Sequence, residues 1–189
     1  MIDDLCSRYP NLGVACLYAD YNDQSNQTLV NILGSFLRQF LTTTREPPIP
    51  DEVIQELYDI KCKGGRVSAE ENIALLKIRL HQLKHAFICV DAVDELAPKV
   101  RQQLLAALQE LSSNNTRIFL TGRDSIKTEV EKCFQVLSGY TVTISARPQD
   151  IEEFVRQQIT EDCDQNPELM DEVLARNIID AIITKSQGM

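Results

Sequence analysis

Short apolar runs alternate along the chain with longer segments in which apolar residues have a helical spacing. The runs GVACLYA, FICV and RIFLT lie near 13–19, 86–91 and 117–121, and β-branched residues alternate with others in YTVTIS, near 141–145. Each run has the length and residue types of a β-strand. We therefore predict four strands at these positions.

The segments between the runs have apolar stripes typical of amphipathic helices. The clearest stripe recurs at i, i+3, i+4 and i+7, and consists of Leu29, Ile32, Leu33, Phe36, Leu37, Phe40 and Leu41. We expect its helix to start near Ser25, with Asp20 and Asp23 as N-terminal caps. Further helices are predicted over 51–62, after a Ser68–Glu71 capping box, over 98–112 and 125–133, from Pro148, and from a cap at Asn166 toward Lys185.

Strands that alternate with helices imply right-handed β-α-β crossovers and a parallel sheet covered by helices on both faces. The 189 residues, 43% hydrophobic and 25% charged, are sufficient for one globular domain with a real core. We therefore predict the α/β class, with a three-layer α/β/α architecture that spans residues 1–189.

Charge and cysteine usage restrict the partners and the compartment. The net charge of -9 opposes binding to nucleic acid or to anionic membranes. No apolar run approaches the ~20 residues needed to cross a bilayer, and Met1 is followed by acidic residues rather than by a signal peptide. The cysteines are scattered without a CxxC pair, which favours reduced thiols and a cytoplasmic location. They are Cys6, Cys16, Cys62, Cys89, Cys133 and Cys163.

The segment FICVDAVDEL places Asp91, Asp94 and Glu95 directly after a predicted buried strand. Side chains just past the carboxyl ends of parallel strands line the ligand crevice of such sheets, and Asp20 and Arg123 have similar positions. This pattern is typical of a Walker B segment. Its first carboxylate holds Mg²⁺, and a later one orients or deprotonates the attacking water. An arginine at the end of a neighbouring strand is suited to reading a terminal phosphate.

Simpler interpretations exist for each of these residues. Asp94 and Glu95 also suit the N-terminus of the helix expected from Pro98, and Arg123 also suits an ion pair with Asp124 that caps the next helix. Asp91 has no comparable structural explanation, because it follows a buried strand. His81 and His85 stand four residues apart on a helix, but HQLKH lacks the glutamate of HExxH, so we interpret them as a solvated helix face.

FICVDAVDEL followed by RIFLTGRD resembles the Walker B and sensor-1 segments of the NACHT-type signal-transduction NTPases, which belong to the STAND class of P-loop proteins. The upstream LYADYNDQSNQTLVNILGSFLRQF resembles fungal members of this group, whose module is similar to the N-terminal NTPase domain of nephrocystin-like proteins. ISARPQDIEEFVRQQI resembles the segment after their fifth strand. The resemblance covers nearly the whole chain.

The resemblance implies an ATP- or GTP-dependent switch that uses Mg²⁺, self-associates during signalling and often precedes ankyrin, WD40 or TPR repeats. It assigns Asp91 to the metal, Asp94 and Glu95 to catalysis, and Arg123 to sensing the nucleotide. It also places the strand near 86–91 between those near 13–19 and 117–121.

One part of the family pattern is missing from the sequence. A P-loop requires GxxxxGK[ST], and none of the seven glycines leads into GK[ST]. The segment MIDDLCSRYP resembles the tail of the helix that follows this loop. We therefore expect a partial domain that lacks its first strand, the P-loop strand, and whose helical lid is cut short after 189. In the family, that first strand lies between the strands near 117–121 and 141–145.

Two functional interpretations remain. The first is part of a nucleotide-dependent switch that hydrolyses ATP or GTP in the intact protein and is inactive as this chain alone. The second is a non-catalytic interaction or regulatory module that keeps the NTPase fold. A third interpretation treats DAVDE as a self-sufficient metal cluster of a phosphohydrolase.

Overall fold

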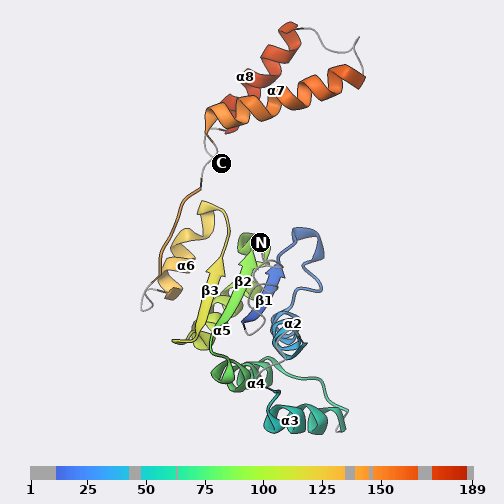
Figure 1. The fold of residues 1–189 in the computed structure, drawn as a ribbon, viewed down its shortest axis with the longest axis vertical. Helices are drawn as coiled ribbons and strands as arrows, with labels where there is room; N and C mark the ends of the chain where they lie inside the picture. The colour runs from blue at the N-terminus through green and yellow to red at the C-terminus, as the bar shows by residue number, and fades with distance from the viewer. Residues whose placement is uncertain are drawn as a thin grey trace. The chain divides into compact units, whose positions relative to one another are not determined.

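The computed structural model describes residues 12–42, 48–62, 64–134, 139–144, 147–165 and 172–186. The chain divides into two compact units, residues 1–138 and 139–189, and each is described by itself (Figure 1). The first unit contains the sheet and the second contains two helices.

In the described residues, the sheet of the first unit has three parallel strands in the order β1-β2-β3. They are β1 (Gly13–Tyr18), β2 (Ala86–Asp91) and β3 (Thr116–Leu120). Three of the four predicted strands are therefore confirmed, and so is the central position of the strand near 86–91.

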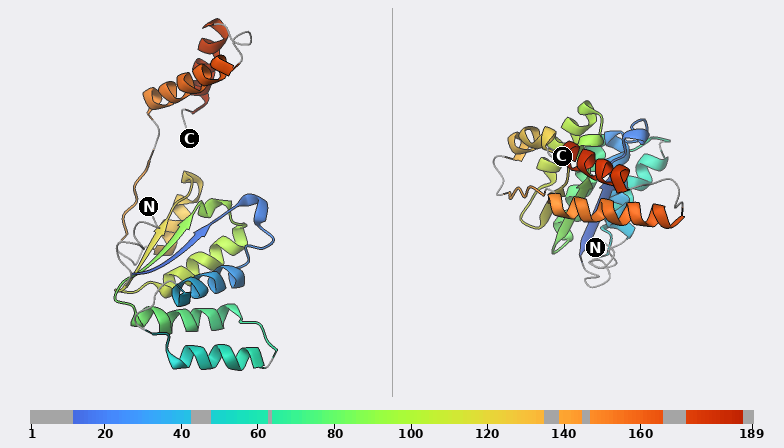
Figure 2. Two further views of the ribbon diagram at one scale, coloured as in Figure 1. Left: turned by 45° about the vertical axis from the view of Figure 1, so that its right-hand side comes forward. Right: turned by 90° about the horizontal axis from the view of Figure 1, so that it is seen from above.

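Helices lie between the strands, as the alternating pattern predicted. The helical elements of this unit are η1 (Tyr21–Asp23), α2 (Leu29–Thr42), α3 (Asp51–Cys62), α4 (Ala69–Gln82), η2 (Val93–Glu95), α5 (Pro98–Leu111), η3 (Asp124–Ile126) and α6 (Lys127–Phe134). In Figure 2 (left), α2, α4 and α5 lie on one side of the sheet, and α3 lies beyond α4. The α/β class is confirmed, and the arrangement is consistent with a three-layer α/β/α fold.

The predicted strand near 141–145 is wrong for the residues that are described there. Residues 141–144 form no strand, and Val142 and Ile144 are 79% and 90% exposed. Alternating β-branched residues favour an extended backbone, but a strand forms only when a neighbour completes its hydrogen bonds. Within the described part of the chain, no strand pairs with this segment.

The expected start of the first long helix is also corrected. This helix, α2, begins at Leu29, and its N-terminus is capped by Thr28, whose Oγ1 accepts a hydrogen bond from the Asn31 N–H at 3.3 Å. Asp20 instead caps η1 by accepting from the Asn22 N–H at 2.8 Å. The polar stretch before α2 is therefore a separate short turn.

Other expectations at helix ends are confirmed where the structure describes them. Ser68 and Glu71 form the predicted capping box at the start of α4. Pro98 occupies the first turn of α5, as predicted from its fixed backbone angle. The predicted cap at Asn166 lies outside the described residues.

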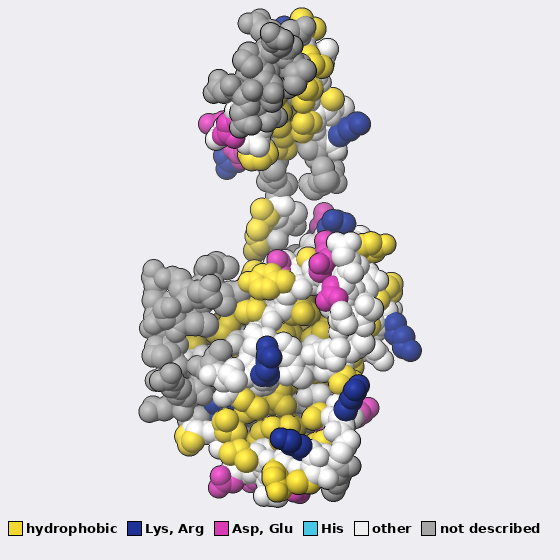
Figure 3. Space-filling model, turned by 90° about the vertical axis from the view of Figure 1, so that its right-hand side faces the viewer, with side chains coloured by type: hydrophobic (Ala, Val, Ile, Leu, Met, Phe, Trp, Pro, Cys, Tyr) yellow, Lys and Arg dark blue, Asp and Glu magenta, His cyan; other side chains and the backbone are white. Residues whose placement is uncertain are grey.

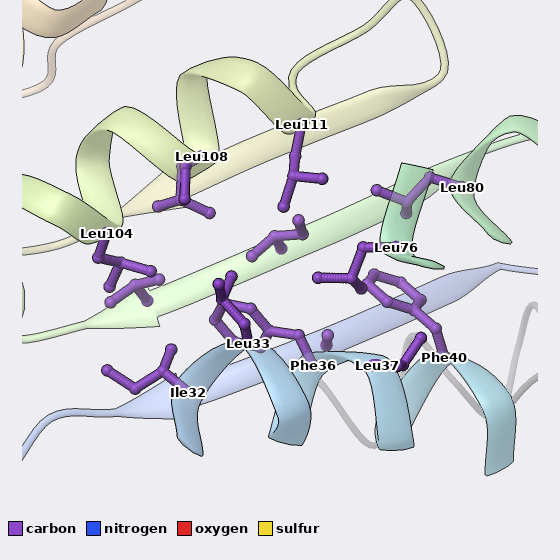
Figure 4. Close-up of a cluster of buried hydrophobic side chains, with 14 of the residues drawn as sticks. Ile32, Leu33, Phe36, Leu37, Phe40, Leu76, Leu80, Leu104, Leu108 and Leu111 are labelled. Carbon is purple, nitrogen blue, oxygen red and sulfur yellow. The ribbon is translucent and has the colours of Figure 1, made fainter. Parts of the chain in front are cut away.

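The core lies between the sheet and helices α2, α4 and α5 (Figure 4). The predicted stripe of α2 supplies Ile32, Leu33, Phe36, Leu37 and Phe40, all buried. They meet buried leucines of α4 and α5, which include Leu76, Leu80, Leu104, Leu108 and Leu111. Large apolar side chains removed from water are the main favourable term in folding, so this layer anchors the sheet.

A buried arginine on α4 joins this helix to the C-terminal end of α2. Arg79 on α4 is fully buried, and its Nε donates to the Phe40 carbonyl oxygen at 3.2 Å, at the end of α2. One of its terminal nitrogens donates to the Pro48 carbonyl oxygen at 3.1 Å. Burial lowers the pKa of Arg79 below its usual range. A cation near a helix C-terminus also interacts favourably with the helix dipole.

A side chain binds the outer edge of β1, where no strand of the described residues pairs. The Cys16 N–H donates to Gln39 Oε1 at 2.8 Å, and Gln39 Nε2 donates to the Cys16 carbonyl oxygen at 3.0 Å. The amide of Gln39 thus binds the main chain as a neighbouring strand would.

The charged side chains of the surface are spread out. On the side of the unit shown in Figure 3, the lysine and arginine side chains stand apart from one another.

The second unit consists of α7 (Pro148–Gln165) and α8 (Glu172–Ser186), which pack against each other. Val155 and Ile179 are 8% and 5% exposed, whereas Phe154 is 64% exposed. None of the helices in the described residues combines the length and apolar character needed to traverse a lipid bilayer.

Candidate functional site

The carboxyl ends of the three parallel strands meet at one edge of the sheet, and the predicted site residues lie there. Asp91 is the last residue of β2, and its side chain is exposed. The hydroxyl of Thr121, one residue past β3, donates to Asp91 Oδ1. The same hydroxyl oxygen accepts from the Ala92 N–H at 2.9 Å. Thr121 therefore holds the Asp91 carboxylate at the junction of β2 and β3.

The chain reverses sharply just after Asp91. Ala92 has φ 53° and ψ 45°, in the left-handed region that non-glycine residues rarely adopt. The turn that follows is tied to β3, because the Val93 N–H donates to the Thr121 carbonyl oxygen at 2.9 Å. Strained backbone that is held by its surroundings is a common feature of functional sites.

Asp94 is directed toward the loop that follows β3. Its Oδ1 accepts from the Arg123 N–H at 3.2 Å, and its Oδ2 lies 3.6 Å from Arg123 Nε. The Asp94 side chain is 9% exposed, whereas that of Arg123 is 80% exposed. Asp94 thus fixes the backbone of the loop while the guanidinium of Arg123 extends toward solvent. The expected pairing of Arg123 with Asp124 is replaced by this contact with Asp94.

Glu95 is directed the opposite way, toward the loop that follows β1. Its Oε2 accepts from the Tyr21 N–H at 3.2 Å. Its carbonyl oxygen accepts from Gln24 Nε2 at 3.0 Å. The alternative that Asp94 and Glu95 serve as N-terminal acids of α5 is not what the structure has, because their carboxylates bind the two loops on either side of the turn.

The separation of these acids bears on metal binding. Among the residues that the structure describes, no three His, Cys, Asp or Glu side chains are grouped so that they could hold a metal ion. The interpretation of DAVDE as a self-sufficient metal cluster is therefore not supported. Asp91 presents an exposed carboxylate at the end of the central strand. One carboxylate suits Mg²⁺ that keeps several waters and is held mainly by substrate phosphates.

Arg101, on α5, binds the main chain of the turn at residues 93–95, although the sequence pattern did not single it out. A terminal nitrogen of Arg101 donates to the carbonyl oxygens of Asp94 and Leu96 at 3.4 and 3.3 Å. Its Nε lies 2.9 Å from Glu129 Oε2, on α6. In the sequence Arg101 is only a polar position on an amphipathic helix. Its role depends on contacts that spacing does not reveal.

Thr121 was also missed as a site residue, although the sequence contains a usable feature. It is the hydroxyl-bearing residue that ends the run RIFLT, level with Asp91 at the end of the neighbouring strand. A polar residue that ends a strand beside a carboxylate is a candidate hydrogen-bond donor to it.

Two shallow depressions lie away from this edge, around α3 and α4. One is lined by Pro48, Ile49, Pro50, Asp51 and Gln82, and the other by Glu52, Lys77, Ile78, His81 and Gln82. His81 lies on the exposed face of α4, as predicted. The prediction is wrong for His85, which is also exposed but lies past the end of α4 at Gln82, in the bend before β2. None of these residues belongs to the edge formed by Asp91, Thr121 and Arg123.

Comparison with known proteins gives one family. The family model described as "Nephrocystin 3, N-terminal" matches residues 1–123, a range that includes Asp91, Asp94, Glu95 and Arg123. No curated protein and no solved structure shows a significant similarity to the chain.

Proposed function

Because the chain belongs to the nephrocystin 3 N-terminal family, we propose that it forms the Walker B and sensor part of a NACHT-like, nucleotide-dependent signalling switch. The observation that supports this proposal best is the arrangement at the carboxyl edge of the sheet. There Asp91, held by Thr121, lies beside a turn whose Asp94 binds the loop that carries Arg123. Ligands of open parallel α/β sheets bind at this edge.

In this proposal Asp91 and Arg123 contact the nucleotide. Asp91 would hold Mg²⁺ through water, and the bound ion would neutralise charge on the β- and γ-phosphates of ATP or GTP. Arg123 has an exposed guanidinium at the end of the adjacent strand, where it can bind a phosphate with several donors. The Thr121 hydroxyl keeps the Asp91 carboxylate directed toward the edge.

The catalytic candidates are Asp94 and Glu95. Either carboxylate can orient or deprotonate an attacking water if it leaves its main-chain partner. Glu95 is the preferred base, because its carboxylate accepts from the N–H of an exposed turn, whereas the Asp94 side chain is only 9% exposed and is bound to Arg123.

The broader biological setting is part of the same proposal. We infer a STAND-type switch of fungal type, located in the cytoplasm, whose partners are a nucleotide and further copies of the same chain. The free cysteines Cys62 and Cys133 suit a reducing compartment.

A second candidate function is a non-catalytic interaction module that keeps the NTPase fold. It is favoured by the absence of GK[ST] from the 189 residues and by the engagement of both Asp94 and Glu95 in main-chain hydrogen bonds. In such a module the acids would serve only to shape the loops.

The test uses a polypeptide that joins an upstream GxxxxGK[ST] segment to this chain. Asp91→Asn should weaken Mg²⁺-dependent nucleotide binding, measured by calorimetric titration with Mg·ATP and Mg·GTP. Glu95→Gln should leave binding largely intact and slow hydrolysis by roughly 10²-fold or more if Glu95 is the general base. Wild-type hydrolysis by Glu95→Gln together with loss in Asp94→Asn would transfer the role of base to Asp94. Absence of binding by the joined polypeptide would favour the non-catalytic module.

A further inference from the structure

The two acids of turn 93–95 divide their contacts between two different loops. Glu95 binds the loop after β1 through the Tyr21 N–H and, with its carbonyl oxygen, through Gln24. Asp94 binds the loop after β3 through the Arg123 N–H. The turn itself is anchored to α5 by Arg101. Displacement of the Glu95 carboxylate therefore affects the first loop without breaking the contacts of Asp94.

The loop over 20–27 is held by hydrogen bonds within it as well as by its contacts with Glu95. The side-chain amide of Gln27 accepts from the Asp20 N–H at 3.3 Å and donates to the Asp20 carbonyl oxygen at 3.0 Å. The side chain of Asn26 donates to Asp23 Oδ1 at 2.6 Å. These bonds join the two ends of the loop to each other. The contacts with Glu95 join the loop to the turn.

We propose that the Glu95 carboxylate has a second role in the nucleotide-free protein, in which it latches loop 20–27 to the candidate site. A ligand that draws this carboxylate toward Asp91 then releases the loop. The latch itself rests on the contacts above, and the identity of the ligand rests on the proposed function. A released loop changes the surface that carries Tyr21, whose side chain is 70% exposed. Occupancy of the site would in this way alter a surface of loop 20–27 that another protein can recognise.

Substitutions on both sides of the latch separate it from general loss of stability. Glu95→Ala removes the acceptor, whereas Glu95→Gln keeps an oxygen that can accept from the Tyr21 N–H. Tyr21→Pro removes the donor and leaves Glu95 intact. Proline suits the first position of η1, and Asp20 before it has φ -135° and ψ 120°, the extended backbone that a residue before proline prefers. Asp94→Ala is the matched control on the opposite loop.

The latch is tested in the nucleotide-free full-length protein by residue-resolved amide hydrogen exchange. Glu95→Ala and Tyr21→Pro should each raise exchange of the Asn22, Asp23 and Gln27 amides by about tenfold or more. These amides are bonded within the loop and exchange when it opens locally, and loss of the Glu95 contact makes that opening more frequent. Glu95→Gln should restore protection. Asp94→Ala should raise exchange around 122–126 and leave the first loop unchanged. Equal protection in all variants, or equal loss at both loops in every variant, would overturn the latch.

The link to the ligand is tested by the same amides in the polypeptide that carries GxxxxGK[ST]. Saturation with Mg·ATP, checked by calorimetry, should raise exchange in loop 20–27 of the wild type and have little further effect on Tyr21→Pro. Binding without any change in this loop would overturn the release step while leaving the proposed function in place. Failure to bind nucleotide would overturn the proposed function and the release step together, and the nucleotide-free experiment would still decide whether the latch exists.

Discussion

Asp91, Asp94 and Glu95 have three different partners although they stand within five residues of one another. Asp91 accepts from the Thr121 hydroxyl, Asp94 from the Arg123 N–H, and Glu95 from the Tyr21 N–H. The divergence arises because the left-handed Ala92 turns the chain away from the strand. Asp91 is exposed although it accepts from Thr121, and such a carboxylate is suited to Mg²⁺ that is held mainly by substrate phosphates.

Thr121 is the residue for which the structure makes the clearest single prediction. Thr121→Val removes the donor to Asp91 and the acceptor for the Ala92 N–H, so we expect the free energy of unfolding to fall by about 1–2 kcal/mol. Thr121→Ser keeps the hydroxyl and should retain most of this stability. Urea unfolding of the two variants checks the prediction. Equal destabilisation by serine and valine would contradict the role of the hydroxyl, because only serine keeps it.

The positions of the site residues could be predicted from the sequence, but their partners could not. A strand-like run that ends in Asp91 places this carboxylate at the edge of a parallel sheet, whichever residues surround it. The partners depend on the three-dimensional pairing of distant segments. Thr121 is 30 positions from Asp91, and Tyr21 is 74 positions from Glu95. No local pattern specifies such contacts.

Among the elements, the helices were predicted better than the strands because their pattern is local. The stripe between Leu29 and Leu41 specifies both the helix and its buried face, and the bounds of α3 agree with the predicted 51–62. A strand needs a partner as well as a propensity. The segment 141–144 has the propensity, but none of the described strands pairs with it.

The edge of β1 gives a prediction about an element rather than a site. Gln39 supplies both a donor and an acceptor to Cys16, so Gln39→Glu loses the donor and places a carboxylate beside a carbonyl oxygen. We expect the variant to lose about 1–2 kcal/mol of unfolding free energy, and to self-associate more readily as the edge becomes accessible. Urea unfolding and sedimentation velocity measure the two effects. Arg38→Ala, on the exposed side of the same helix, is the control, and a similar result for both variants would contradict the role of Gln39.

At the level of the whole chain, the two edges of the sheet differ. The β1 edge is covered by the Gln39 amide, whereas β3 is the last strand of the order β1-β2-β3, and no described strand lies beyond it. An uncovered edge presents unpaired main-chain donors and acceptors and invites another strand. The exposed side chain of Phe119 on β3, 55% accessible, adds apolar surface next to this edge. The family resemblance places the P-loop strand at this edge, and no described strand occupies that position.

The 189-residue chain on its own is expected to bind neither Mg·ATP nor Mg·GTP with micromolar affinity. Its sequence has no GK[ST], so the backbone cradle and the lysine that neutralise phosphates are not encoded in it. The acids Asp91, Asp94 and Glu95, at the carboxyl ends of the strands, and the net charge of -9 repel a nucleotide unless Mg²⁺ intervenes. One or two carboxylates hold Mg²⁺ only weakly. Calorimetric titration of this chain, beside the polypeptide that carries GxxxxGK[ST], checks the prediction. Micromolar binding by the 189 residues alone would contradict it and would support a metal site at Asp91 that needs no P-loop.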